Sequence, residues 1–143
     1  MTRPGLHHLS LGVRDIERSA RFYDAALAPL GLVRAWSDLR PGEPGQGVGY
    51  GLPGTGDVFA LKHRPGQRPS TVAGFHLAFA APSREAVQRF YASACEMGGR
   101  SDGAPGPRPA YGEHYYAAFV LDPDGHRLEA VIDTPPAMGS DPG

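Results

Sequence analysis

An internal repeat is the feature that most restricts how this chain can fold. The segment 8–31 aligns without gaps with the segment 76–99, an offset of 68 positions, and 8 of the 24 aligned positions are identical. The shared residues include a leading His-Leu pair and a central Arg-Phe-Tyr. Such a repeat indicates two copies of one supersecondary unit. We therefore expect two similar modules that pair about a pseudo-twofold axis.

The first module reads as one strand, one helix and three further strands. Residues 6–13 alternate as a strand does, with large apolar residues on one face and small ones on the other. Asp15 is a typical helix N-cap, and apolar residues then recur at helical spacing as far as Leu30. Three more strands are expected at residues 32–37, 48–52 and 57–63.

The second module repeats this order. A strand at 75–80 precedes a helix capped by Ser83, and a loop is expected over 103–109. Two strands, at 115–121 and 127–132, then form a hairpin around the turn Asp-Pro-Asp-Gly. The expected fold is α+β, a single domain of two βαβββ modules that form one cleft. The modules cover about residues 5–64 and 74–133, and a flexible tail is expected at 134–143.

Composition excludes several classes of partner. The 143 residues carry a formal net charge of −1, whereas nucleic-acid-binding domains are usually basic. We find no apolar run long enough to span a bilayer and no leading signal segment. The single cysteine, Cys95, cannot form an internal disulfide. We therefore expect a cytoplasmic protein without nucleic-acid or membrane partners.

Three residues suggest a metal site. Glu129 lies in the middle of an apolar strand, so it either faces water or lies opposite a positive group, because burial of an unpaired carboxylate is costly. His8 and His76 occupy matched positions on strand faces whose other residues are small. The alternatives are a pair of satisfied core histidines or an accident of the repeat. The matched positions and the mid-strand glutamate favour a metal site, and strand alternation favours His8 over its neighbour His7 as the ligand.

Together these motifs resemble the vicinal oxygen chelate superfamily, which includes glyoxalase I, bleomycin-resistance proteins and extradiol dioxygenases. The resemblance covers residues 6–132 and rests on four motifs: His8-Leu-Ser-Leu, the Asp15-capped helix with Phe22-Tyr23, the second histidine strand, and the Asp122-Pro-Asp-Gly hairpin that leads to Glu129. It implies that His8, His76 and Glu129 bind one divalent metal ion in the cleft. Iron, manganese, nickel and zinc all remain open as its identity.

The chain departs from glyoxalase I at one ligand. Glyoxalase I has a glutamate in the last strand of its first module, and the segment 56–60 aligned with 125–129 places Ala60 there. Alanine cannot bind a metal. The remaining set of two histidines and one carboxylate suits non-haem iron and also catalytic zinc.

Several polar residues are candidates for substrate contacts. Lys62, the only lysine, should share the face of Ala60 and bind an anionic substrate group, unless its stem simply covers the sheet. Tyr111 is a candidate substrate contact, and His114 and Tyr115 are candidates for acid–base groups or a lid. All three aromatic residues are also compatible with ordinary strand edges. His7, His63 and His126 are interpreted as surface or strand-end residues.

Three functions compete. The first is a metalloenzyme of the lyase, isomerase or dioxygenase class, in which Glu129 also takes part in catalysis on a small oxygenated substrate. The second is a protein that sequesters an antibiotic or metabolite, as the bleomycin-resistance proteins do. The third is a catalytically silent metal-binding module. The resemblance also implies a homodimer, whose cleft forms either within one chain or between two.

Overall fold

The structure is a computed structural model that describes residues 5–66, 68 and 73–136. The first module contains β1 (Leu9–Val13), α1 (Ile16–Leu27), the short 3-10 helix η1 (Ala28–Leu30), β2 (Val33–Asp38), β3 (Gly47–Gly51) and β4 (Phe59–His63). The second module contains β5 (Leu77–Ala80), α2 (Arg84–Glu96), β6 (Arg100–Pro107), β7 (Tyr116–Leu121) and β8 (Arg127–Ile132). Residues 137–143 of the expected flexible tail lie outside the described part of the chain.

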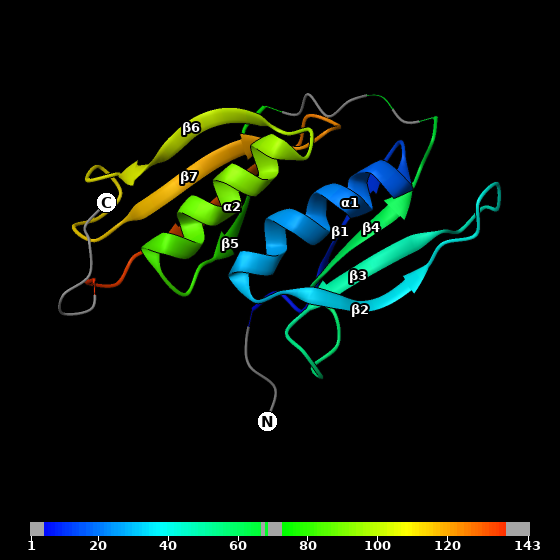
Figure 1. The fold of residues 1–143 in the computed structure, drawn as a ribbon, viewed down its shortest axis with the longest axis horizontal. Coiled ribbons are helices and arrows are strands. Elements are labelled where there is room, and N and C mark those ends of the chain that lie inside the picture. The colour runs from blue at the N-terminus through cyan, green and yellow to red at the C-terminus, as the bar shows by residue number, and fades with distance from the viewer. Residues whose placement is uncertain (1–4, 67, 69–72, 137–143) are drawn as a thin grey trace.

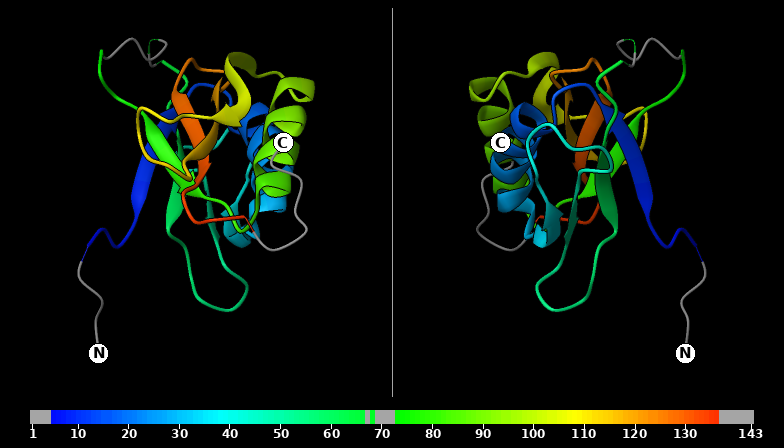
Figure 2. Two further views of the ribbon diagram at one scale, coloured as in Figure 1. Left: turned by 90° about the vertical axis from the view of Figure 1, so that its left-hand side faces the viewer. Right: turned by 90° about the vertical axis from the view of Figure 1, so that its right-hand side faces the viewer.

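The two modules have the same topology, which confirms the predicted α+β fold. Each forms a four-stranded sheet, ordered β1-β4-β3-β2 in the first and β5-β8-β7-β6 in the second. In both sheets the first strand pairs in parallel with the last, and the other pairs are antiparallel. Figure 1 shows α1 and α2 lying next to each other, and Figure 2 shows β1, in blue, on the side away from the helices.

Local sequence rules explain both helices. The Asp15 carboxylate accepts a hydrogen bond from the Arg18 backbone N–H (3.1 Å), and the Ser83 hydroxyl accepts one from Ala86 (3.0 Å). These are the predicted N-caps. The apolar faces of α1 and α2 are buried in one core that both modules share. None of the described helices is long and apolar enough to cross a membrane.

The prediction of a loop at residues 103–109 is wrong over most of that segment. Residues 100–107 form β6, which pairs with β7 across two register shifts, between Ser101 and Gly103 and between Gly103 and Gly106. Two prolines and two glycines gave this segment the composition of a loop. Such residues are tolerated because β6 is the outer strand of its sheet, where missing ladder hydrogen bonds cost little.

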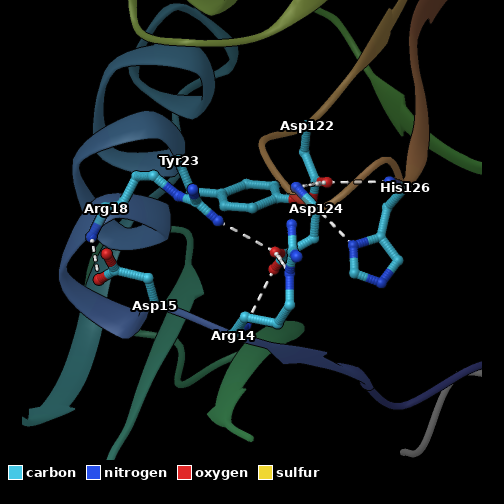
Figure 3. A network of polar contacts seen from close by, with 7 residues as sticks. All are labelled: Arg14, Asp15, Arg18, Tyr23, Asp122, Asp124 and His126. Atoms are coloured by element: carbon cyan, nitrogen blue, oxygen red, sulfur yellow. Dashed lines mark hydrogen bonds and ion pairs between the residues drawn. The ribbon is translucent and has the colours of Figure 1, made fainter. Parts of the chain in front are cut away.

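Ion pairs to one buried carboxylate connect the β7–β8 turn to the first module (Figure 3). The fully buried carboxylate of Asp124 accepts hydrogen bonds from the Arg14 guanidinium at 2.9 Å and from Arg18 at 3.1 Å. The Arg14 backbone N–H also donates to it at 3.1 Å. Since Arg14 precedes α1 and Arg18 lies on it, the turn fixes the position of that helix against the second module.

His126 belongs to the same network. It directly precedes β8, as the strand-end alternative predicted, but it does not lie at the surface. Its exposed fraction is only 5%, and its Nδ1 lies 2.9 Å from the carboxylate of Asp122. The hydroxyl of Tyr23 donates to the same carboxylate. The turn folds back onto α1, and this tertiary contact buries a residue that a hairpin alone would leave exposed.

Candidate metal centre

Glu129 occupies a central position in the second sheet. It lies beside Ala78 of β5 and Phe119 of β7, and only 2% of the residue is exposed. Its neighbours Leu128 and Ala130 point into the core, so by strand alternation the carboxylate lies on the opposite face. The residues of β5 on that face, Ala78 and Ala80, are exposed. The carboxylate is therefore covered by its immediate neighbours, although the sheet face on which it lies is exposed beside it.

Two side chains contact this carboxylate. The Nε2 of His76 lies 3.0 Å from Oε1, and the hydroxyl of Tyr115 donates a short hydrogen bond to Oε2. Partial burial, and then the hydrogen bond to Glu129 and its charge, raise the pKa of Tyr115 to about 12. The tyrosine is therefore a proton donor at neutral pH. The partners of the buried carboxylate in the described chain are thus an imidazole and a hydroxyl.

The geometry of this pair is compatible with one metal ion. Two ligand atoms that lie about 2.1 Å from one ion at right angles are about 3 Å apart. The distance between His76 Nε2 and Glu129 Oε1 has this value. Tyr115 fixes the other carboxylate oxygen, which is the kind of outer hydrogen bond that orients a metal-binding carboxylate. The donor set of one imidazole and one carboxylate suits a divalent transition metal.

His8 lies apart from this pair within one chain. It is exposed just before β1, on the face that it shares with Ser10 and Gly12, and its Nδ1 lies 2.9 Å from that of His7. It borders an apolar pocket of about 380 Å³ whose described lining includes β5 but neither His76 nor Glu129. Among residues 5–66, 68 and 73–136, no three His, Cys, Asp or Glu side chains gather as metal ligands would.

The strand register supports the predicted equivalence of Ala60 and Glu129. Ser10 of β1 pairs with Ala60, and its counterpart in the repeat, Ala78 of β5, pairs with Glu129. Ala60 therefore occupies, in the first sheet, the place that the carboxylate occupies in the second. The first module contributes an exposed histidine just before β1 but no acid at this position.

The remaining candidates are distributed over both modules. Tyr111 is 68% exposed, and its ring packs edge-on against Tyr115 with centroids 5.4 Å apart. The Nε2 of His114 lies 3.7 Å from the carboxylate of Glu113, an exposed neighbour. Lys62 pairs in register with Gly12, so it lies in the first module on the face of His8. The structure thus brings Tyr115 to Glu129 and Tyr111 to Tyr115, whereas Lys62 and His8 share the other module.

Sequence reasoning missed Trp36, which lies on the same face as Lys62. Its indole covers β3, and the ammonium of Lys62 is 5.2 Å from the ring centroid. The signal in the sequence was the strand Gly47–Gly51, Gly-Val-Gly-Tyr-Gly, which has no side chains on alternate positions. Such a strand leaves room for a large side chain from a neighbouring strand.

Comparisons with known proteins agree with this architecture. A family model for the Glyoxalase/Bleomycin resistance protein/Dioxygenase superfamily matches residues 5–130. A glyoxalase/bleomycin resistance protein from Albidiferax ferrireducens T118 is 32% identical with a TM-score of 0.70, covering 87% of this chain and 95% of that one. A search among curated proteins found no match.

Two more distant structures share the fold alone. A glyoxalase I variant from Zea mays is 24% identical with a TM-score of 0.66, covering 87% of this chain and 45% of that one. The genomically encoded fosfomycin resistance protein FosX from Listeria monocytogenes is 18% identical with a TM-score of 0.63, covering 93% and 96%. The match of the family model to most of the chain shows that this protein belongs to the Glyoxalase/Bleomycin resistance protein/Dioxygenase superfamily.

Proposed function

We propose that this protein is a metal-dependent enzyme that binds a small oxygenated substrate through two adjacent oxygens. One divalent ion is bound by His8, His76 and Glu129. The observation that carries the proposal is the 3.0 Å approach of His76 Nε2 to Glu129 Oε1 beside an open sheet face. Neutral imidazole and ionised carboxylate are the forms that bind metals, so binding weakens as the pH falls through the range in which histidine is protonated.

The side chains around Glu129 have distinct proposed roles. When bound, a divalent ion supplies Lewis-acid polarisation of substrate oxygens. Tyr115 keeps a proton on its hydroxyl and directs it at Glu129, which orients the carboxylate. Glu129 and His114 are the proposed proton acceptors for chemistry of the lyase, isomerase or dioxygenase type. Tyr111, exposed at the rim, and Lys62, in the first module, contact the substrate.

We further propose that the complete site forms in a homodimer. His8 is separated from His76 and Glu129 in the described chain. The pocket beside His8 is also lined by three exposed apolar side chains, Leu6 (88%), Leu52 (55%) and Val58 (47%). A second copy that covers this surface removes apolar area from water. It also brings His8 to His76 and Glu129 of the second copy, which completes the set of three ligands.

A second candidate function is sequestration of a small molecule without chemistry. It is supported by the apolar pocket of about 380 Å³ beside His8, whose size suits a small ligand. The similar structures include resistance proteins as well as glyoxalase I. The two functions differ in their need for metal. A ligand bound equally well with and without the metal ion supports sequestration, and strict metal dependence supports the enzyme.

The test is metal content after dialysis. Wild-type protein, Glu129→Ala and the control Glu113→Ala are loaded with a divalent ion, dialysed and examined by elemental analysis. We expect about one ion per chain for the wild type and for the control, which removes a glutamate whose side chain is 87% exposed. Glu129→Ala should lose most of its metal because it lacks the only anionic ligand. Equal metal in all three proteins contradicts the proposal, and circular dichroism checks that each is folded.

A further inference from the structure

The face of the first module that carries His8 is built around Trp36. A Cβ atom added at Gly49 would lie 2.1 Å from the indole Nε1, and one added at Gly47 would lie 2.9 Å from Cη2. These glycines alternate with Val48 and Tyr50, which are buried in the core. The indole therefore lies flat on β3, on the face away from α1. The glycines are required there because any side chain would collide with the ring.

The indole in turn positions Lys62. The ammonium of this residue lies 5.2 Å from the ring centroid, within the range of a cation–π interaction. Lys62 also pairs in register with Gly47 on one side and Gly12 on the other, so small residues surround its stem. A flexible lysine is thus held at one place on the sheet, with its charge near the surface.

A pocket of about 570 Å³ opens beside this ammonium. It is lined by Ser10 and Gly12 of β1, by Lys62 of β4, and by Arg64 with the two residues that follow it. The guanidinium of Arg64 donates to the carbonyl of His63 at 2.7 Å. Within the described part of the chain, neither Lys62 nor Arg64 has a carboxylate within ion-pair distance. The lining therefore carries two positive charges and one hydroxyl, but no acid.

We infer that this pocket binds the anionic group of the substrate, a carboxylate or a phosphate. Charged donors of this kind form short, strong hydrogen bonds to such oxygens, and the pocket volume is in the range of small-molecule sites. The inference rests on the proposed function and adds a substrate class to it: an organic anion. Its ligand contacts are the ammonium of Lys62, the guanidinium of Arg64 and the hydroxyl of Ser10.

The strand spacing sets the length of that substrate. Gly12, which pairs with Lys62, lies four residues beyond His8 in the sequence. At about 3.3 Å per residue, the two levels are about 13 Å apart along the strand. An anion bound at Lys62 thus belongs to a molecule whose metal-binding oxygens are several bonds away from its charge. Inorganic phosphate is too short to reach both levels, so it occupies only the part of the substrate site beside Lys62.

The test is anion binding by metal-free protein. Chelator-treated protein is titrated with inorganic phosphate and, separately, with citrate at constant ionic strength. Binding is followed by calorimetry and by the fluorescence of Trp36, the single tryptophan, which touches Lys62. Lys62→Met removes the ammonium but keeps an apolar stem over the indole. It should weaken binding about tenfold or more, whereas Lys62→Arg should retain it.

The control is Arg127→Ala, which removes one positive charge from an exposed arginine of the second module. It should bind phosphate and citrate like the wild type. Saturable binding of either anion that only Lys62→Met loses supports the inference, and the preferred anion identifies the group. No saturable binding of either anion, or equal binding by wild type and Lys62→Met, overturns it. Because these titrations contain no metal, their outcome is independent of whether His8, His76 and Glu129 bind an ion.

Discussion

The hydroxyl of Tyr23 on α1 donates a 2.5 Å hydrogen bond to the carboxylate of Asp122 in the β7–β8 turn, and so connects the two modules (Figure 3). Both residues are almost fully buried. Burial first, and then the charge of Asp122, raise the pKa of Tyr23 well above its ordinary value, so the tyrosine remains a donor. The carboxylate also accepts from the backbone N–H groups of Asp124 and His126, both at 2.9 Å.

Removing this hydroxyl should destabilise the fold. Tyr23→Phe keeps the ring, which packs against Phe22 and Phe59, but leaves a buried carboxylate oxygen with one donor fewer. We expect the free energy of unfolding to fall by about 1 to 3 kcal/mol. Urea denaturation followed by circular dichroism measures the change. Tyr91→Phe, on the partly exposed side of α2, is the matched control and should change the free energy by less than about 0.5 kcal/mol.

The same network should make stability depend on pH. Burial lowers the pKa of His126, but the hydrogen bond to Asp122 and the charges of Asp122 and Asp124 outweigh it and raise the pKa above 6.5. A group whose pKa is higher in the folded than in the unfolded protein stabilises the folded state fully at pH values below its unfolded pKa. That contribution is lost as the pH rises through the folded pKa. We therefore expect the free energy of unfolding to decrease as the pH rises above about 6.5.

The variant His126→Asn tests this assignment. Urea denaturation from about pH 5.5 to about pH 9 should show a smaller decrease for this variant than for the wild type. His114→Gln removes a histidine whose side chain is 36% exposed and should keep the wild-type slope. The groups that face His126 are Asp122 and Asp124 in its own turn, and Tyr23 from α1 contacts Asp122. An unchanged slope in His126→Asn would assign the pH dependence to other groups.

Tyr115 should influence metal binding without being a ligand in our proposal. Its hydroxyl holds Oε2 of Glu129, so Tyr115→Phe frees the carboxylate to rotate away from His76. The loss of an outer hydrogen bond of this kind typically weakens metal affinity about 10-fold to 100-fold. Competition with a chelator of known affinity measures the effect. Tyr111→Phe keeps the ring contact with Tyr115 and should leave affinity unchanged, and equal effects of both variants would argue against the proposed role.

The local features of the fold were predictable because short-range rules determine them. Asp15 and Ser83 cap their helices, and the repeat predicted that Ala60 would take the place of Glu129 in the first sheet. β6 was not predictable from its composition, because prolines and glycines are typical of loops as well as of outer strands. The sequence left surface and strand-end positions open for His126, and its burial was not predictable because it depends on a turn that contacts a distant helix.

In the candidate site, too, the sequence predicted local features but not the contacts between distant segments. His8 and His76 are both exposed and directly precede β1 and β5, and their role as ligands stays a prediction. The repeat alone could not show that these histidines lie apart within one chain, because that depends on how α1 and α2 pack together. The Gly-Val-Gly-Tyr-Gly strand indicates room for a large side chain, but that Trp36 fills it is a contact between strands that the local pattern does not specify.

If two copies share each site, two variants that each fail to bind metal should regain part of the metal binding when they form a mixed dimer. His8→Ala lacks one ligand from the first module, and Glu129→Ala lacks one from the second. If each site combines His8 of one copy with His76 and Glu129 of the other, each homodimer has two incomplete sites. A mixed dimer has one complete site and one that lacks both ligands. We therefore expect the mixed dimer to hold about half of the metal of wild type.

The mixed dimer is obtained by co-expressing the two variants with different affinity tags and purifying the protein on both tags in succession. Elemental analysis after dialysis then compares it with wild type and with each variant alone. A dimer that combines His8→Ala and Glu113→Ala is the matched control, because Glu113 is not a proposed ligand. It retains one complete site under both arrangements. If the site forms within one chain, the mixture of His8→Ala and Glu129→Ala has no complete site, and its metal content should equal that of the variants alone. That result would reject the shared site while leaving the three ligands in place.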